Sequence, residues 1–429
     1  TTLNSYSQQN SNYDLAAKFS PKKLAKLVHS SSVRPHYLKN GDKFWYQYKT
    51  TEGSNYYIVD PNKKTKKKLF DNDKMAAWLT EITKDPYDAK HLPKFDFKFI
   101  DNETAIKFRV TSKYEDEESQ DIKKNKIEKD KKNKKVFLFK YVLGSNKLTL
   151  ISNKKAPKEN WKKWANISPD STVVFYSKKF NLYWMDKENF LKATKNEKDS
   201  TIVENQWTKD GVKDYSYGGY GRGLDNEEVK KKKNDRFPIR GYWSSDSKKF
   251  VYQRTDSREI KDLWVINSVA KKRPTLETYK YHMPGEAEYY KREILIFDIP
   301  SKEIKNVKLD RSKQQYISIF SKPRKPSEYD DDFKPTLLLS EKNKIYFNTI
   351  SRDRKNLDIC VADLNTGEVK VLIKEKTNTY FYETKSIYLI NNESEMIHWS
   401  ERDGWGHFYR YNSNGNLINR ITTGSYHSF

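Results

Sequence analysis

The chain has 429 residues, of which 14% are aromatic, and a net charge of +25. It is longer than the roughly 250–300 residues at which one hydrophobic core usually stops growing, and it shows little helical periodicity, so we expect a β-rich repeat architecture rather than a helical protein. Its positive charges are scattered through the apparent turns and 58 acidic residues accompany them, so we do not expect nucleic-acid binding.

Residues 1–35 form a polar lead-in with one short helix. Ser20 has the character of an N-cap, and Pro21 suits the first helical position. The apolar face of this helix consists of Leu24, Leu27 and Val28. We expect that face to pack against a larger body.

From residue 36 one pattern recurs. A turn rich in Gly, Asn, Asp or Ser precedes two aromatic or β-branched strands, a polar turn and a closing apolar strand. The six opening turns lie at 40–42, 101–103, 168–171, 244–247, 341–343 and 391–393. Units of roughly 40–60 residues are typical of four-stranded propeller blades; short strands also fit a β-sandwich, but the repetition favours a propeller. We therefore predict an all-β fold, a β-propeller over residues 36–429 with about six blades visible and further blades beyond Phe429.

Two copies are predicted in more detail. The first copy ends in a closing strand at 69–70. The fourth contains strands at 250–253 and 263–266, with its outer hairpin displaced to 294–299. Three insertions interrupt the pattern: a solvated charged loop at 114–135, a Gly-, Tyr- and Lys-rich loop at 209–240, and a Pro-punctuated linker at 321–335.

The chain offers no complete hydrolytic site of its own. Ser216 resembles the serine of a Gly-x-Ser-x-Gly elbow, but Asp214 stands two residues before it where a small residue is needed, and no βα alternation follows. We therefore expect no catalytic residue in this chain. The seven histidines lack metal-ligand spacing and no dinucleotide or phosphate-loop motif is present, so we expect no metal and no cofactor.

The single cysteine, Cys360, lies between Ile359 and Val361 and has the character of a small buried hydrophobe. No apolar run approaches the roughly 20 residues of a membrane span. The chain starts at Thr1 with neither an initiator Met nor a signal-like segment, so we expect that a targeting segment has been removed or that the sequence is part of a longer protein.

Two segments carry a family resemblance. Residues 240–250 read RGYWSSDSKKF and lead on to YKYHMPGE at 279–286, while residues 400–411 read SERDGWGHFYRY. They resemble the N-terminal propeller of dipeptidyl peptidase IV-type enzymes, in the prolyl oligopeptidase family of serine peptidases. The resemblance implies an eight-bladed propeller that selects peptide substrates for a C-terminal α/β-hydrolase domain, which is not present in this chain. It also implies a pair of glutamates that binds the free amino terminus of the peptide.

The sequence departs from that family at the glutamate pair, because Gly218 and Gly219 stand where the two carboxylates would be. Glu227 and Glu228 lie in the same loop and would be substitutes, although their lysine-rich surroundings favour a solvated charge run. Dipeptide-releasing specificity is therefore in doubt. The substrate-binding candidates of this loop are Tyr217, Arg222, Glu227 and Glu228.

The sequence therefore predicts the substrate-gating propeller of a dipeptidyl peptidase IV-like serine exopeptidase that is not catalytic by itself. The alternative is a stand-alone binding or scaffold propeller without enzymatic activity. The resemblance places the protein in the periplasm or outside the cell. We leave open whether it forms a homodimer.

Overall fold

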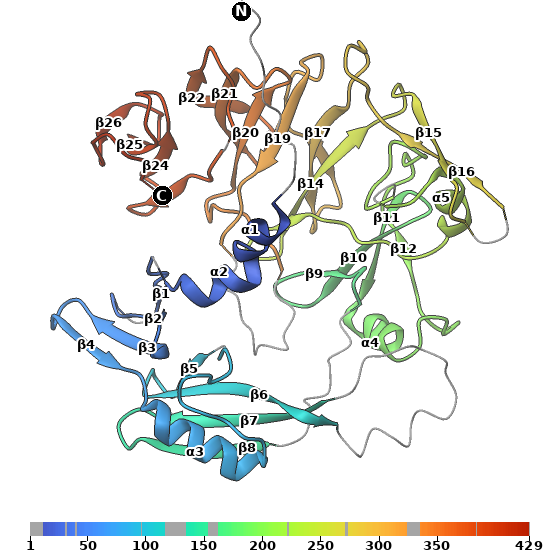
Figure 1. The fold of residues 1–429 in the computed structure, drawn as a ribbon. Coiled ribbons are helices and arrows are strands. Elements are labelled where there is room, and N and C mark those ends of the chain that lie inside the picture. The colour runs from blue at the N-terminus through green and yellow to red at the C-terminus, as the bar shows by residue number, and fades with distance from the viewer. Residues whose placement is uncertain are drawn as a thin grey trace, which may run out of the picture. The chain divides into compact units, whose positions relative to one another are not determined.

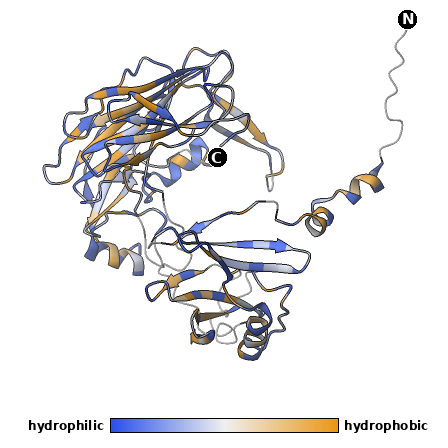
Figure 2. Ribbon diagram, turned by 90° about the vertical axis from the view of Figure 1, so that its left-hand side faces the viewer, coloured by the Kyte–Doolittle hydropathy of each residue, from blue (hydrophilic) through white to orange (hydrophobic). Residues whose placement is uncertain are grey.

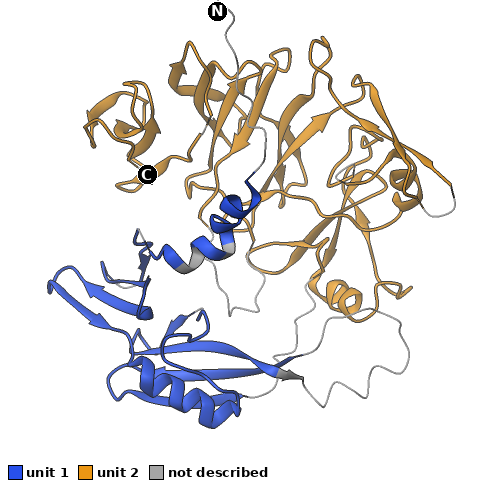
Figure 3. Cartoon of the chain, in the orientation of Figure 1, with its two compact units in different colours: residues 1–158, 326–331 blue, residues 159–325, 332–429 orange. Residues whose placement is uncertain are grey.

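The computed structural model describes residues 12–30, 32–38, 41–95, 97–115, 134–152, 162–220, 223–270, 273–323, 335–382 and 384–428 (Figure 1). Its contacts divide the chain into two compact units (Figure 3). Unit 1 comprises residues 1–158 and 326–331, and unit 2 comprises residues 159–325 and 332–429. The division falls inside the region 36–429 that the sequence predicts as one propeller.

The fold is all-β, and its repeating element is a four-stranded antiparallel sheet with the strands in sequence order, which is the blade of a β-propeller. Six such sheets occur in the described residues, two in unit 1 and four in unit 2. Coloured by hydropathy, the strands alternate between apolar and polar stretches (Figure 2), as expected for sheets that pack their faces together. The predicted fold class is confirmed.

The first sheet of unit 1 contains β1 (His36–Tyr37), β2 (Phe44–Thr50), β3 (Gly53–Asp60) and β4 (Thr65–Lys68). The second contains β5 (Lys98–Ile100), β6 (Ala105–Glu115), β7 (Lys134–Val142) and β8 (Lys147–Ser152). Tyr56, Phe108 and Phe139 share one buried cluster with helix α3 (Asn72–Thr83). The carboxylate of Asp71 caps this helix by accepting hydrogen bonds from two backbone N–H groups of its first turn.

The first two sheets of unit 2 contain β9 (Asn166–Ile167), β10 (Val173–Lys178), β11 (Asn181–Asp186) and β12 (Asn205–Gln206), then β13 (Tyr242–Trp243), β14 (Lys249–Asp256), β17 (Lys291–Asp298) and β18 (Ile304–Asn306). The other two contain β19 (Gln315–Ile319), β20 (Lys344–Ser351), β21 (Asn356–Asp363) and β22 (Val369–Lys376), then β23 (Tyr388–Ile390), β24 (Glu395–Ser400), β25 (His407–Asn412) and β26 (Leu417–Arg420). Neighbouring sheets share buried clusters.

The cluster between the first two of these sheets shows how the repeats are joined. Phe175 of β10 stacks on Trp243 of β13 with ring centroids 5.2 Å apart, and both contact Phe250 of β14. The indole N–H of Trp243 donates to the side-chain oxygen of Asn166, at 2.9 Å, so its buried polar atom is satisfied. Phe297 of β17 extends the cluster.

Two details of the predicted repeats are wrong. The closing strand of the first sheet is Thr65–Lys68, and the neighbouring residues 69 and 70 are buried outside the strand. In the fourth repeat, β14 pairs with β17 rather than with residues 263–266. Those residues belong to a separate two-stranded hairpin, β15 (Asp262–Asn267) and β16 (Thr275–Lys280).

The helices were only partly predicted. Helix α2 (Pro21–Leu27) begins where Ser20 and Pro21 indicated and follows a short helix α1 (Tyr13–Lys18), but its expected packing face is exposed, with Leu27 at 73% and Val28 at 62%. Helices α3, α4 (Lys187–Lys195) and α5 (Asn226–Lys232) were not predicted.

Of the predicted insertions, residues 116–133 and 324–334 lie outside the described residues.

Candidate functional site

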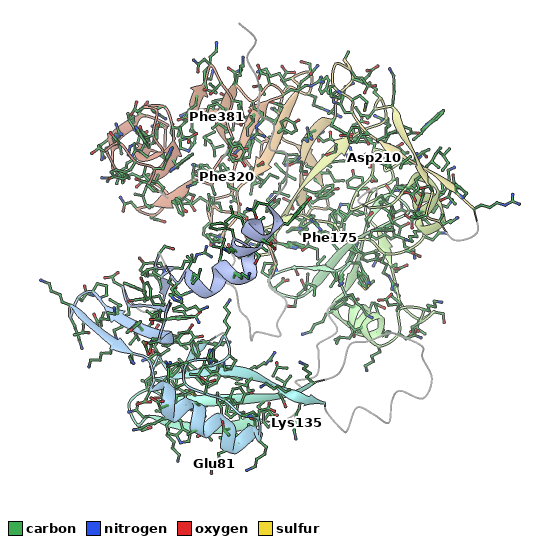
Figure 4. All side chains as sticks on the ribbon, viewed as in Figure 1. Glu81, Lys135, Phe175, Asp210, Phe320 and Phe381 are labelled. Carbon is green, nitrogen blue, oxygen red and sulfur yellow. The ribbon has the colours of Figure 1, made fainter. Side chains whose placement is uncertain are left out.

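The loop at 207–241, between β12 and β13, lies at the end of the sheets where β14 finishes. In each four-stranded sheet of unit 2 we call the first strand in chain order the inner strand and the fourth the outer strand. Because neighbouring strands run in opposite directions, the outer strand finishes at the end of the sheet where the inner strand begins and the second strand finishes. The connections between successive sheets therefore leave from this end. A hydrogen bond of 2.8 Å from the backbone N–H of Ser257, just after β14, to the carbonyl of Asp214 confirms that the loop meets this turn. Figure 4 labels Asp210 in the first part of the loop.

A buried arginine anchors the loop to the sheet. The guanidinium of Arg254, on β14, donates from Nε to Glu293 of β17 at 2.6 Å and from Nη1 to Asp210 of the loop at 2.6 Å. Its Nη2 donates to the hydroxyl of Tyr215 at 2.5 Å, and that hydroxyl donates to Glu293 at 2.6 Å. The side chains of Arg254 and Glu293 are 6% and 5% exposed, so the pair lies largely out of water.

The charges of this cluster balance each other. Glu293 also forms an ion pair with Arg311, with 3.0 Å between the nitrogen and the oxygen. Burial raises the pKa of Asp210, but the hydrogen bond and charge of Arg254 outweigh it, and the pKa lies below its ordinary value. Asp210 is therefore ionised at neutral pH, and Arg254 already neutralises it. The cluster can hold the loop in place, but it offers a weak partner to an incoming ammonium group.

Tyr217 has a structural position in this loop. It is 2% exposed, its ring stacks on Tyr252, and its hydroxyl donates to Asp210 at 3.0 Å. The guanidinium of Arg254 lies 4.6 Å from the centre of its ring. Whether Tyr217 contacts a substrate stays a prediction. In the structure its side chain packs between the loop and the sheet and holds the two together.

At the expected glutamate pair, close packing requires Gly218, whereas a Cβ added at Gly219 would make only ordinary van der Waals contact with Pro238. Gly218 has a φ of +88°, and a Cβ added there would overlap the side chain of Ser177. Its backbone N–H donates to the hydroxyl of Tyr252 at 2.8 Å, and that of Gly219 donates to the carbonyl of Pro238 at 3.0 Å. A glutamate at position 218 does not fit this backbone.

The other candidate carboxylates lie on α5 and have lysine partners. Glu227 is 2.6 Å from the ammonium of Lys230, and Glu228 is 3.5 Å from that of Lys232. Glu228 also forms a capping box with Asp225 at the start of the helix. This arrangement agrees with a solvated charge run. The fourth candidate, Arg222, lies outside the described residues.

No histidine lies beside Ser216 in the described part of the loop, and no metal centre occurs in the residues that the structure describes. Ser216 follows a tight turn in which Asp214 has a φ of +66°, and no histidine bonds to it in the described part of the loop. No group of three or more potential metal ligands occurs in the ranges that the structure describes. None of the helices it describes is long and apolar enough to cross a membrane.

Comparison with known proteins identifies the family. The family model described as the dipeptidyl peptidase IV (DPP IV) N-terminal region matches residues 115–428. A solved dipeptidyl peptidase 4 of Porphyromonas gingivalis is 14% identical, with a TM-score of 0.44, over 97% of this chain and 50% of its own. A protein of Bacteroides ovatus described as a dipeptidyl aminopeptidase IV is 15% identical, with a TM-score of 0.42, over 90% of this chain and 44% of its own. The chain thus spans about half the length of these two proteins or less. Because the family model matches well over half of the chain, the chain belongs to the family of dipeptidyl peptidase IV N-terminal regions.

Proposed function

We propose that this chain is the substrate-gating propeller of a dipeptidyl peptidase IV-like serine exopeptidase, which selects peptides for a C-terminal α/β-hydrolase domain. The observation that carries the proposal is the family match over residues 115–428. Catalysis would be supplied by the serine, aspartate and histidine of the hydrolase domain.

The geometry of the loop supports a relaxed requirement for a free amino terminus. Recognition of an ammonium group in a shielded cavity needs a carboxylate whose charge is available. Gly218 has no room for one, and Asp210 is already neutralised by Arg254. We therefore propose that the parent enzyme accepts peptides with blocked amino termini better than a family member with the glutamate pair does.

The setting that fits this function is the periplasm or the exterior of the cell, where such exopeptidases meet peptides. A stand-alone binding propeller is the second candidate. The observation that favours it is the hairpin β15–β16, which leaves Trp264 73% exposed and Ile266 70% exposed, because exposed apolar side chains suit contact with another protein, including a second copy in a homodimer.

The experiment that tests the proposal is to read the gene beyond the codon for Phe429. We expect about two more blades followed by a Gly-x-Ser-x-Gly elbow in a βα pattern, and labelling of the complete product by a fluorophosphonate at that serine. A reading frame without such an elbow would overturn the peptidase proposal and favour the binding propeller.

A further inference from the structure

A cavity of about 840 Å³ lies in unit 2, away from the loop at 207–241. Its walls are the end of β22 with the segment that follows it (374–381), the turn after β24 (401–404) and His427. Phe381, labelled in Figure 4, belongs to this wall. Ligand sites in proteins are commonly concave and combine apolar side chains with a few placed polar groups, as this cavity does.

The cavity opens at the same end of the sheets as the loop at 207–241. The segment 377–387 runs from the outer strand β22 to the inner strand β23, and the turn 401–406 joins β24 to β25. Both are connections of the kind that leaves from the end where β14 finishes, because strand direction alternates in every sheet. The cavity and the loop at 207–241 therefore face the same end of the sheets.

One of the residues that line the cavity is Arg402, whose guanidinium is held in place by hydrogen bonds. Arg402 donates from Nε to the hydroxyl of Ser400 at 3.2 Å and from Nη2 to the carboxylate of Glu375, and its guanidinium lies 4.5 Å from the centre of the Tyr409 ring. Its Nη1 has no carboxylate partner among the described residues, and the side chain is 30% exposed. A guanidinium that Ser400 and Glu375 hold in one orientation, with Nη1 lacking a carboxylate partner in the described part of the chain, suits recognition of a further carboxylate.

The charges around this arginine leave an excess of cations. The carboxylate of Glu375 is 7% exposed and is shared by Arg402 and His398, whose Nε2 is 3.4 Å away. Lys374 and Lys376 line the cavity and have no ion pair in the described residues, whereas Glu401 has only His427, at 3.8 Å. The lining thus carries three Lys and Arg side chains against two Glu side chains, and neither lysine has an ion pair within the part of the chain that the structure describes.

We propose that this cavity is a subsite for an acidic side chain of a bound peptide. The carboxylate would accept hydrogen bonds from Arg402, the lysines would add long-range attraction, and the rings of Tyr380 and Phe381 would contact the aliphatic part of the peptide. This inference rests on the proposed function, since it names the substrate class that the propeller favours.

The test compares two fluorescein-labelled peptides that differ only by Glu or Gln at one position, with binding to the chain of residues 1–429 followed by anisotropy at low salt. We expect the Glu peptide to bind about tenfold more tightly, which corresponds to one charge-assisted hydrogen-bonded contact. The variant Lys374→Ala/Lys376→Ala should reduce that preference at least threefold, and Arg402→Lys, which keeps the charge but loses the planar fork, should reduce it further.

The matched control is Lys370→Ala on the same strand, because Lys370 bonds to Asn414 and does not line the cavity. It should keep the wild-type preference. Equal affinity for the Glu and Gln peptides would overturn the subsite while leaving peptide selection intact. An unchanged preference in both cavity variants would place the acidic contact elsewhere and also overturn it. Failure of both peptides to bind would overturn the subsite together with the proposed function.

Discussion

Replacing Arg254 by Met should strongly destabilise unit 2. The substitution keeps the apolar stem but removes the guanidinium that bonds to Glu293, Asp210 and Tyr215. Among the described residues, Glu293, 5% exposed, would keep Arg311 alone as a cationic partner, and the side chain of Arg311 is 42% exposed. Removing one member of a buried ion pair costs about 3–5 kcal/mol, because the remaining charge stays out of water without full compensation.

The assay is urea-induced unfolding followed by tryptophan fluorescence. The double variant Arg254→Met/Glu293→Leu should recover much of the loss, because the stranded carboxylate is removed with its partner. The matched control is Lys230→Ala, whose pair with Glu227 is exposed and should contribute nothing measurable. A loss below about 1 kcal/mol for Arg254→Met would refute the role of the arginine as the anchor of the loop.

Three further predictions follow from single sites. Gly218→Ala should lower the free energy of unfolding by about 1–3 kcal/mol in thermal or urea unfolding, since the φ of Gly218 is +88° and the new Cβ would overlap Ser177. The control Gly41→Ala, with a similar φ of +90° but no atom near the new Cβ, should cost less. Equal losses for the two variants would contradict the role of packing at Gly218. Burial raises the pKa of Glu375, but His398 and Arg402 outweigh it and lower the value from 4.5 to about 2. The ionised Glu375 carboxylate therefore contributes roughly 3 kcal/mol to the free energy of unfolding above pH 4.5, and this contribution is lost as the pH falls toward 2. Glu375→Gln should flatten that part of the curve of unfolding free energy against pH. Burial raises the pKa of the Cys360 thiol to about 12, so a thiol reagent at pH 8 should label it only after denaturation; rapid labelling of the native protein would contradict its burial.

The repeating sheets could be predicted because their turns and strands are local signals. Turn residues such as Ser168 and Asp170 adopt the predicted conformation through their own side chains, and the hydroxyl of Ser168 donates to Asp170. Helix α3 was missed although its buried residues Met75 and Leu79 are spaced by four, because the aromatic strands around it dominated the pattern.

The candidate site was harder to predict because its key contacts join distant residues. Arg254 and Glu293 are direct cross-strand partners, but this becomes visible only once β14 is paired with β17 across the inserted hairpin. The family resemblance implied a carboxylate at the position where this sequence has Gly218. The sequence could not show that the backbone there has a positive φ and lies against Ser177, since that depends on the packing of β10 beneath the loop.

Peptide hydrolysis by the product of the complete gene would test the proposed peptidase function directly. The measurement is kcat/KM for one chromogenic dipeptidyl substrate with a free amino terminus and for its acetylated form. We expect both substrates to be hydrolysed, with kcat/KM values within about tenfold of each other, because the described part of the loop offers the ammonium group no available carboxylate pair. Hydrolysis of neither substrate would contradict the role in a peptidase, and a strong preference for the free amine would contradict the proposed role of the loop.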